Sequence, residues 1–226
     1  MNLPFDILYE DNHLIAINKP AGMLVQGDKT GDIPLSEYVK QYIKEKYKKQ
    51  NNVYLGVTHR IDRPVSGVLL FARTSKALAR LNKMFQEKTI QKTYWAVVKN
   101  HPPKMEDTLV HYLIKDQVRN KSKAYPTETK GTKRAETHYK WLHSSDNYHL
   151  LEMKPLTGRH HQIRVQLAAI DCPIKGDLKY GFKRTNKDAS IHLHARQIEF
   201  IHPVSQEPIV ITASPPKEVV WDAMVS

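Results

Sequence analysis

The sequence predicts an α+β fold, because β-rich hairpins and amphipathic helical segments both occur along its 226 residues. Residues 5–18 contain two short strands joined by a polar turn, and residues 135–153 contain a second hairpin of alternating apolar and polar residues. In residues 35–49, by contrast, apolar side chains recur at helical spacing. A chain of this length can bury one substantial core, so we expect a single domain.

The composition indicates a nucleic-acid-binding protein of the cytoplasm. Lys and Arg total 35, Asp and Glu total 23, and the formal net charge is +12. Such an excess attracts a polyanion, although a merely basic soluble protein has the same composition. No apolar stretch is long enough to span a bilayer, and residues 1–6 lack the features of a secretory signal. The single cysteine, Cys172, excludes an internal disulfide and suits a reducing compartment.

The first half of the chain places two predicted helices among strands. Residues 35–49 carry an apolar face that includes three tyrosines, which we expect to be core side chains and not base-stacking surfaces. A second helix is expected with Ser75 as its N-cap and an end near Lys88, and its buried stripe would be Leu78, Leu81, Met84 and Phe85. Lys19 follows the second strand, and we expect an ordinary solvated lysine there, with a phosphate contact as the alternative.

The second half begins with a strand over residues 90–98, in which Tyr94 and Trp95 point to opposite faces. Residues 115–134 have few apolar anchors and predict a long exposed loop that could grip RNA phosphates. A turn then leads into a helix near Ile163, and its basic first turns suggest an anionic neighbour, either a protein carboxylate or a phosphate. Strands over residues 191–200 and 208–212 and a short terminal helix complete the predicted elements.

Residues 59–67 carry the strongest chemical signal, because Asp62 lies there between Arg60 and Arg63. Pro64 fixes its own backbone and disfavours a helical conformation at Arg63, so we expect Asp62 on a rigid bend before an apolar strand. Opposite charge this close favours the ionised carboxylate, which would act as an acceptor or a nucleophile. The alternative interpretation is a surface salt-bridge cluster that caps a strand.

Several separated stretches resemble motifs of the RluA-type RNA pseudouridine synthases, in the same order, from about Ile7 to Thr212. They are residues 18–22, 59–67, 92–98, 157–164, 176–181, 193–196 and 200–203. The resemblance implies an α+β fold in which helices and loops flank a central, mainly antiparallel mixed sheet with an active-site cleft across it. It also implies one catalytic domain over residues 1–226, without a separate N-terminal RNA-binding domain.

The same motifs imply roles for four residues. Asp62 matches the catalytic carboxylate, Tyr94 the aromatic residue against the target base, and Arg164 the partner that pairs with Asp62. Arg60 matches the arginine that members of the family insert into the RNA stack when the uridine is extruded. Three positions depart from the family pattern, namely Ile61, Val65 and Gln166, and only Val65 loses a hydroxyl at the turn.

The function implied by the resemblance is isomerisation of specific uridines in tRNA or rRNA to pseudouridine after base flipping. We expect a monomer that needs no metal, nucleotide or redox cofactor. The Arg63-Pro64 pair resembles members that act on tRNA. One alternative is a non-catalytic RNA-binding or RNA-chaperone protein that retains the fold, and another is a metal-dependent hydrolase that uses His192 and His194.

Overall fold

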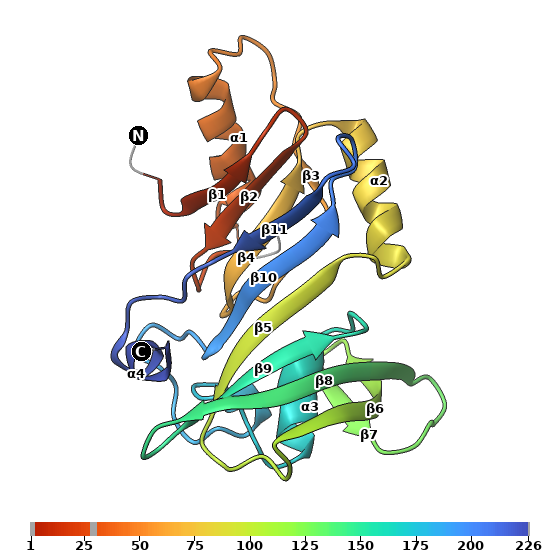
Figure 1. Ribbon diagram of the computed structural model, residues 1–226, viewed down its shortest axis with the longest axis vertical. Helices are drawn as coiled ribbons and strands as arrows, with labels where there is room; N and C mark the ends of the chain where they lie inside the picture. Colours follow the sequence, from red (N-terminus) through yellow and green to blue (C-terminus); the bar gives the residue numbers. More distant parts are fainter. Residues whose placement is uncertain (1–2, 28–30, 226) are drawn as a thin grey trace. The chain divides into compact units, whose positions relative to one another are not determined.

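The computed structural model describes residues 3–27 and 31–225, and its elements are shown in Figure 1. In chain order they are β1 (Asp6–Glu10), β2 (Leu14–Lys19), α1 (Leu35–Lys46), β3 (Gly56–Val57), β4 (Ser66–Ala72), α2 (Ser75–Gln86), β5 (Gln91–Val98), β6 (Glu106–Asp116), β7 (Lys121–Tyr125), β8 (Lys133–Ser144), β9 (His149–Pro155), α3 (Gln162–Ala169), the 3-10 helix η1 (Leu178–Tyr180), β10 (Leu193–Ile201), β11 (Pro208–Thr212) and α4 (Val219–Val225). The strand pairs below are antiparallel wherever their register is defined, so the predicted α+β class with a mainly antiparallel sheet is confirmed.

The chain divides into two compact units. Unit 1 comprises the residues up to Gln91 together with Ala195–Pro215, and unit 2 comprises Lys92–His194 together with the residues from Pro216 onward. Met1 and Asn2, on which the expectation about a secretory signal partly rests, lie outside the described residues. Within the described ranges, every helix is too short or too polar to cross a bilayer.

Unit 1 is built on the strand order β1-β2-β4-β10, with β3 paired to β4 and β11 paired to β10. Successive side chains of β2 point to opposite faces, so Ile15 and Ile17 pack with the α1 side while Leu14 and Ala16 pack with the α2 side. All seven residues of β4 are buried, because a helix covers each face of this part of the sheet (Figure 1).

Both helices of unit 1 match the predicted apolar faces. In α1, Leu35, Val39 and Ile43 are buried, and the helix ends at Lys46, three residues before the predicted end. In α2 the stripe of Leu78, Leu81, Met84 and Phe85 packs as predicted. The N-cap is Thr74 and not Ser75, because the Thr74 hydroxyl accepts a hydrogen bond from Ala77 N at 3.2 Å.

Unit 2 has the strand order β5-β9-β8-β6-β7. One face packs against α3, where Thr137 of β8 hydrogen bonds with Gln162 and Gln166 of the helix. The other face packs against α4, whose Trp221 and Met224 contact Val97 of β5 and Leu150 of β9. Trp95 joins this second cluster, so Tyr94 points to the opposite face, as predicted.

The long exposed loop predicted over residues 115–134 is only partly present. β6 ends at Asp116, β7 (Lys121–Tyr125) lies inside the stretch and β8 begins at Lys133, so loops remain only at residues 117–120 and 126–132. β7 was missed because its inward side chains are Ser122 and Ala124, which carry little hydrophobic signal, while the alternate positions include lysines. The Ser122 backbone is instead held by a buried hydrogen bond from its N–H to the Tyr180 hydroxyl at 2.8 Å.

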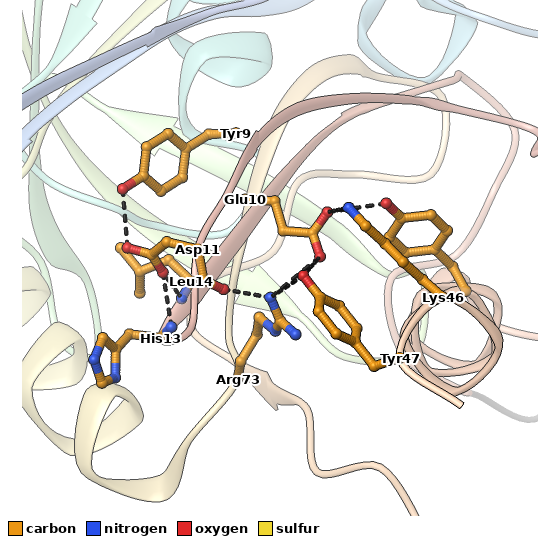
Figure 2. Close-up of polar contacts among 9 residues, drawn as sticks. Tyr9, Glu10, Asp11, His13, Leu14, Lys46, Tyr47 and Arg73 are labelled. Atoms are coloured by element: carbon orange, nitrogen blue, oxygen red, sulfur yellow. Dashed lines mark hydrogen bonds and ion pairs between the residues drawn. The ribbon is translucent and has the colours of Figure 1, made fainter. Parts of the chain in front are cut away.

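A buried carboxylate, that of Glu10, ties α1 to β1 in unit 1 (Figure 2). Its oxygens accept hydrogen bonds from Lys46 Nζ at 2.6 Å, the Tyr47 hydroxyl at 2.8 Å and the Tyr42 hydroxyl at 2.9 Å. Arg73, which is itself buried, contacts the same carboxylate at 3.1 Å. Burial alone would raise the pKa of Glu10, but the hydrogen bonds from Lys46, Tyr47 and Tyr42 outweigh it and leave the pKa below its usual 4.5.

We expect Glu10→Gln to lower the free energy of unfolding by about 2 kcal/mol at pH 7, because the hydrogen bonds would no longer be charge-assisted. A carboxylate with a lowered folded pKa stabilises the protein above its unfolded pKa and loses that contribution as the pH falls through the folded value. Urea denaturation at pH 7 and below pH ~4 should therefore show that the stability difference between the wild type and Glu10→Gln becomes smaller in acid.

The matched control is Glu37→Gln, because Glu37 forms an exposed ion pair with Lys40, and both of these residues lie on α1. Its effect should stay below about 1 kcal/mol at both pH values. An equal effect of the two substitutions would contradict a special role for Glu10.

Candidate active site

Asp62 lies on a turn between β3 and β4 whose neighbours are anchored in the core. Ile61 is 7% exposed and Val65 is 2% exposed, while Asp62 itself is half-buried. The Asp62 carbonyl accepts a hydrogen bond from Val65 N at 3.0 Å, which closes the turn around Arg63 and Pro64. The sequence therefore holds this carboxylate on a short bend with fixed ends, as predicted from the proline.

A second turn, over residues 19–22, braces the first. The Arg63 carbonyl accepts hydrogen bonds from Gly22 N at 2.8 Å and from Lys19 Nζ at 3.1 Å. In return, Arg63 Nε donates to the Gly22 carbonyl at 2.8 Å. These contacts fix the backbone next to Asp62 from both sides.

Lys19 is fully buried, so the prediction of a solvated loop lysine is wrong. Its ammonium donates to the carbonyls of Pro20 at 2.9 Å and of Arg63 at 3.1 Å. Burial lowers the pKa of Lys19 to about 7, an effect that the charge of Arg63 adds to and the charge of Asp62 opposes. One signal in the sequence could have located it, since Lys19 ends a strand in which Leu14 to Ile17 are uniformly apolar.

The two arginines beside Asp62 have different surroundings. Arg63 is exposed and forms an ion pair with Asp32 at 2.9 Å, in addition to its backbone contacts. Arg60 is exposed on the same segment, and no hydrogen bond or ion pair joins it to another residue of the described ranges. Arg63 therefore supports the turn, and Arg60 presents its guanidinium outward.

Gly67 sets the path of the chain after the turn. It has φ +116, and a β-carbon there would lie 2.3 Å from the backbone oxygen of Ala195 on β10. No other residue type fits this approach without moving the strand. The segment between Asp62 and β4 consequently enters the sheet along one defined route.

In unit 2, Tyr94 lies on the face of the sheet that α3 covers. Tyr94 is directly opposite Met153, which is directly opposite Tyr139. Thr137 is two residues from Tyr139 and shares its face, and Thr137 contacts the α3 side chain of Gln166 at 2.6 Å. The register alone therefore puts Tyr94 and α3 on the same side of these strands.

Arg164 is buried on α3 and forms a bidentate ion pair with Asp177. Its Nε donates to Asp177 Oδ2 at 2.7 Å and its Nη2 donates to Oδ1 at 2.9 Å. The guanidinium also lies over the Tyr180 ring, 5.1 Å from the centroid. Asp177 is thus the protein carboxylate expected near the basic first turns of this helix, and no local sequence pattern marks it as the partner.

His161 precedes α3 in a left-handed conformation, with φ 53. The Tyr180 hydroxyl accepts a hydrogen bond from Ser122 N and also hydrogen bonds with His161 Nδ1 at 2.8 Å. Burial, together with the positive charge of Arg164 and other nearby bases, lowers the pKa of His161 to about 2. His161 is therefore neutral, which leaves Arg164 as the positively charged side chain beside it.

The four predicted site residues fall into two pairs. Asp62 and Arg60 belong to the turn of unit 1, while Tyr94 and Arg164 belong to the α3 side of unit 2. His192, a candidate metal ligand of the alternative hydrolase, contacts Glu218 at 2.9 Å and Asn186 at 3.0 Å. Among the residues that the structure describes, no three His, Cys, Asp or Glu side chains are grouped to hold a metal ion.

Known proteins resemble this chain over most of its length. Residues 13–169 match the profile of the family described as RNA pseudouridylate synthase. A tRNA pseudouridine synthase C of Vibrio parahaemolyticus is 33% identical over 92% of this chain and 89% of its own. Another from Pectobacterium carotovorum is 32% identical over 96% of this chain, which spans 59% of that longer protein. The solved structure of human RNA Pseudouridylate Synthase Domain Containing 4 superposes with a TM-score of 0.80, at 25% identity, over 96% of this chain and 90% of its own.

We expect Asp177→Asn to lower the free energy of unfolding by about 3 kcal/mol, because it removes a bidentate contact from a buried guanidinium. Urea denaturation at pH 7 would measure the loss. The control is Asp171→Asn, since Asp171 is exposed nearby in a left-handed conformation that asparagine also adopts. Similar stabilities of the two variants would show that the Arg164–Asp177 pair contributes little to folding.

Proposed function

The chain belongs to the RNA pseudouridylate synthases of the RluA type, and from this premise we propose that it isomerises uridine in tRNA with Asp62 as the catalytic carboxylate. Family membership makes the protein an isomerase that acts on RNA, so the predictions of an enzyme and of an RNA substrate are confirmed. The choice of tRNA, the site residues and their roles are the proposal.

Two observations support tRNA as the substrate. The relatives from Vibrio and Pectobacterium are both named tRNA pseudouridine synthase C, and each aligns with more than nine-tenths of this chain. The net charge of +12 suits a partner with many phosphates. Ribosomal RNA is the second candidate, because the sequence motifs occur in enzymes of both kinds.

Asp62 is the proposed reacting group, and the braced turn is the observation that carries this assignment. Pseudouridine formation breaks the N-glycosidic bond of uridine, rotates the uracil and rejoins it through carbon. A carboxylate can serve by attacking the ribose C1′ or the uracil C6, or by stabilising positive charge at C1′. Each route requires a carboxylate held in place, and the hydrogen bonds around Arg63 supply that rigidity.

Tyr94 and Arg164 have supporting roles in the proposal. Tyr94 holds the face of the uracil and acts as the base in a proton step, which its half-buried position on β5 allows. Arg164 serves as the charge partner of Asp62. Its guanidinium is already oriented by Asp177, so little conformational freedom is lost when it acts.

Arg60 is the proposed RNA-contacting residue of the turn. A uridine in a folded RNA is stacked, and its extrusion costs a few kcal/mol. Arg60 is exposed two residues before Asp62, where its planar guanidinium can replace the extruded base in the stack. We further propose a cytoplasmic monomer that works without cofactors, with residues 1–226 acting as one catalytic domain.

We expect Asp62→Asn to abolish pseudouridine formation and to leave the affinity for RNA within a few fold, because the amide keeps the shape but not the charge. Pseudouridine would be mapped by carbodiimide primer extension on total tRNA and rRNA, from wild-type cells and from cells with only the variant. Loss of a discrete tRNA site supports the proposal. Loss of an rRNA site would show that the substrate is rRNA and not tRNA. Full activity of Asp62→Asn would overturn the catalytic assignment. Asp6→Asn, an exposed carboxylate on β1, is the control.

We expect Arg60→Ala to lower turnover on folded tRNA by about 10- to 100-fold while it weakens initial binding much less, because it removes the group that stabilises the extruded state. Turnover would be compared on folded tRNA and on a transcript whose target uridine is unpaired. A smaller loss on the unpaired target supports flipping, and an equal loss on both contradicts it. Arg184→Ala, at another exposed arginine, is the control.

A further inference from the structure

Lys92, the second residue of β5, is a cation to which the described residues offer no hydrogen-bond or ion-pair partner. It is partly buried, and no hydrogen bond or ion pair joins it to another residue in the described ranges. Burial lowers the pKa of Lys92 below its usual value. Among the described residues, burial also lowers the pKa of Lys19 and of Lys175, and both have acceptors. Lys19 donates to two carbonyls and Lys175 donates to Asn186 Oδ1 at 2.8 Å.

Lys92 lies close to Tyr94, the residue proposed to hold the uracil. Lys92 and Tyr94 are two residues apart on one strand, so their side chains leave the same face, about 7 Å apart along it. That face is the one covered by α3. A β-carbon at Gly158 would lie 3.9 Å from Lys92 Nζ, which places the ammonium beside the turn that leads into α3.

A partly buried ammonium without an acceptor lowers the stability of the folded protein. Removing part of its hydration without supplying an acceptor disfavours folding, and an isosteric apolar side chain would avoid that cost. Residues that reduce stability in this manner are found where a ligand completes the contact. A strongly hydrated point charge of this kind pairs well with a phosphate oxygen.

We propose that Lys92 binds a backbone phosphate of the RNA next to the uridine that Tyr94 holds. This inference rests on the proposed function, because it assumes that Tyr94 faces the target base. The phosphate would replace the water that the fold removes from the ammonium. It would also fix the register of the RNA along β5, so Lys92 positions the substrate without taking part in the chemistry.

The test measures binding of unmodified tRNA, transcribed in vitro, to proteins that carry Asp62→Asn so that no product forms. Lys92→Met should weaken binding about tenfold near 0.1 M salt and reduce the slope of log K against log salt by about one. Lys92→Arg should keep most of the affinity and the slope. Lys99→Met removes an exposed lysine just after β5, and its effect should be less than twofold.

Thermal unfolding separates a substrate contact from an internal structural role. Lys92→Met should melt at the same temperature as its parent or higher, because it removes a poorly solvated charge. A lower melting temperature, or unchanged affinity and slope, would overturn the proposal. When Lys92→Met is introduced alone, with Asp62 intact, a loss of turnover together with an unchanged salt slope of binding would indicate that Lys92 contacts the uracil, and it would also overturn the proposal.

A parallel assay of the otherwise unmodified enzyme on the same tRNA keeps the two proposals distinguishable. Activity on tRNA with no binding effect at Lys92 supports the function and rejects the phosphate contact. Absence of activity on tRNA, with the expected loss of affinity in Lys92→Met, rejects the proposed substrate and supports the contact. Absence of any RNA binding by the parent protein rejects both.

Discussion

The geometry of Asp62 depends on a buried ammonium. Lys19 is fully buried at the end of β2, and its hydrogen bonds to the carbonyls of Pro20 and Arg63 join two turns that are distant in the sequence. Backbone carbonyls at turns need partners when water is excluded, and here one side chain supplies them for both turns. Because Arg63 directly follows Asp62, the same contacts that satisfy the backbone also restrict where the carboxylate can move.

In unit 2, α3 is held by side-chain hydrogen bonds in a similar way, with amides in place of an ammonium. Gln162 and Gln166 are buried on α3 and hydrogen bond to groups of β8, including the Thr137 hydroxyl and the Glu136 carbonyl. These bonds are directional, so they fix the rotation of the short helix better than apolar contacts alone would. Gln166 is one of the three positions that depart from the family pattern, and both ends of its amide form buried hydrogen bonds. That departure from the family pattern therefore has a structural explanation in this chain.

The sequence predicted elements whose hydrophobic pattern is strong and missed features that depend on distant polar partners. The helical stripes of α1 and α2 and the hairpin strands β8 and β9 follow from local periodicity. β7 has no such pattern, since Ser122 is held by Tyr180, a residue 58 positions later. Burial of Lys19 likewise depends on a hydrogen bond to the distant carbonyl of Arg63. The partner of Arg164, Asp177, lies in a turn, where hydrophobic periodicity gives no signal.

The site shows the same division. Proline and flanking charges identified the bend at Asp62, because those are local properties of the chain. Alternation within β5 shows that Tyr94 and Trp95 point to opposite faces, but it does not show which of the two faces α3. That assignment depends on the register in which β5 pairs with β9 and β9 pairs with β8.

The distribution of paired and unpaired cations distinguishes groups that serve the fold from groups available to RNA. Lys19, Arg63 and Arg164 are engaged by carbonyls or carboxylates of the protein, and their removal should affect folding first. Arg60 and Lys92 have no such contacts within the described residues, although Lys92 is partly buried. A net charge of +12 alone says only that a polyanion is attracted. Arg60 and Lys92 are close in sequence to Asp62 and Tyr94 respectively, so this attraction can become specific contact there, because binding RNA at these positions breaks no ion pair within the described residues.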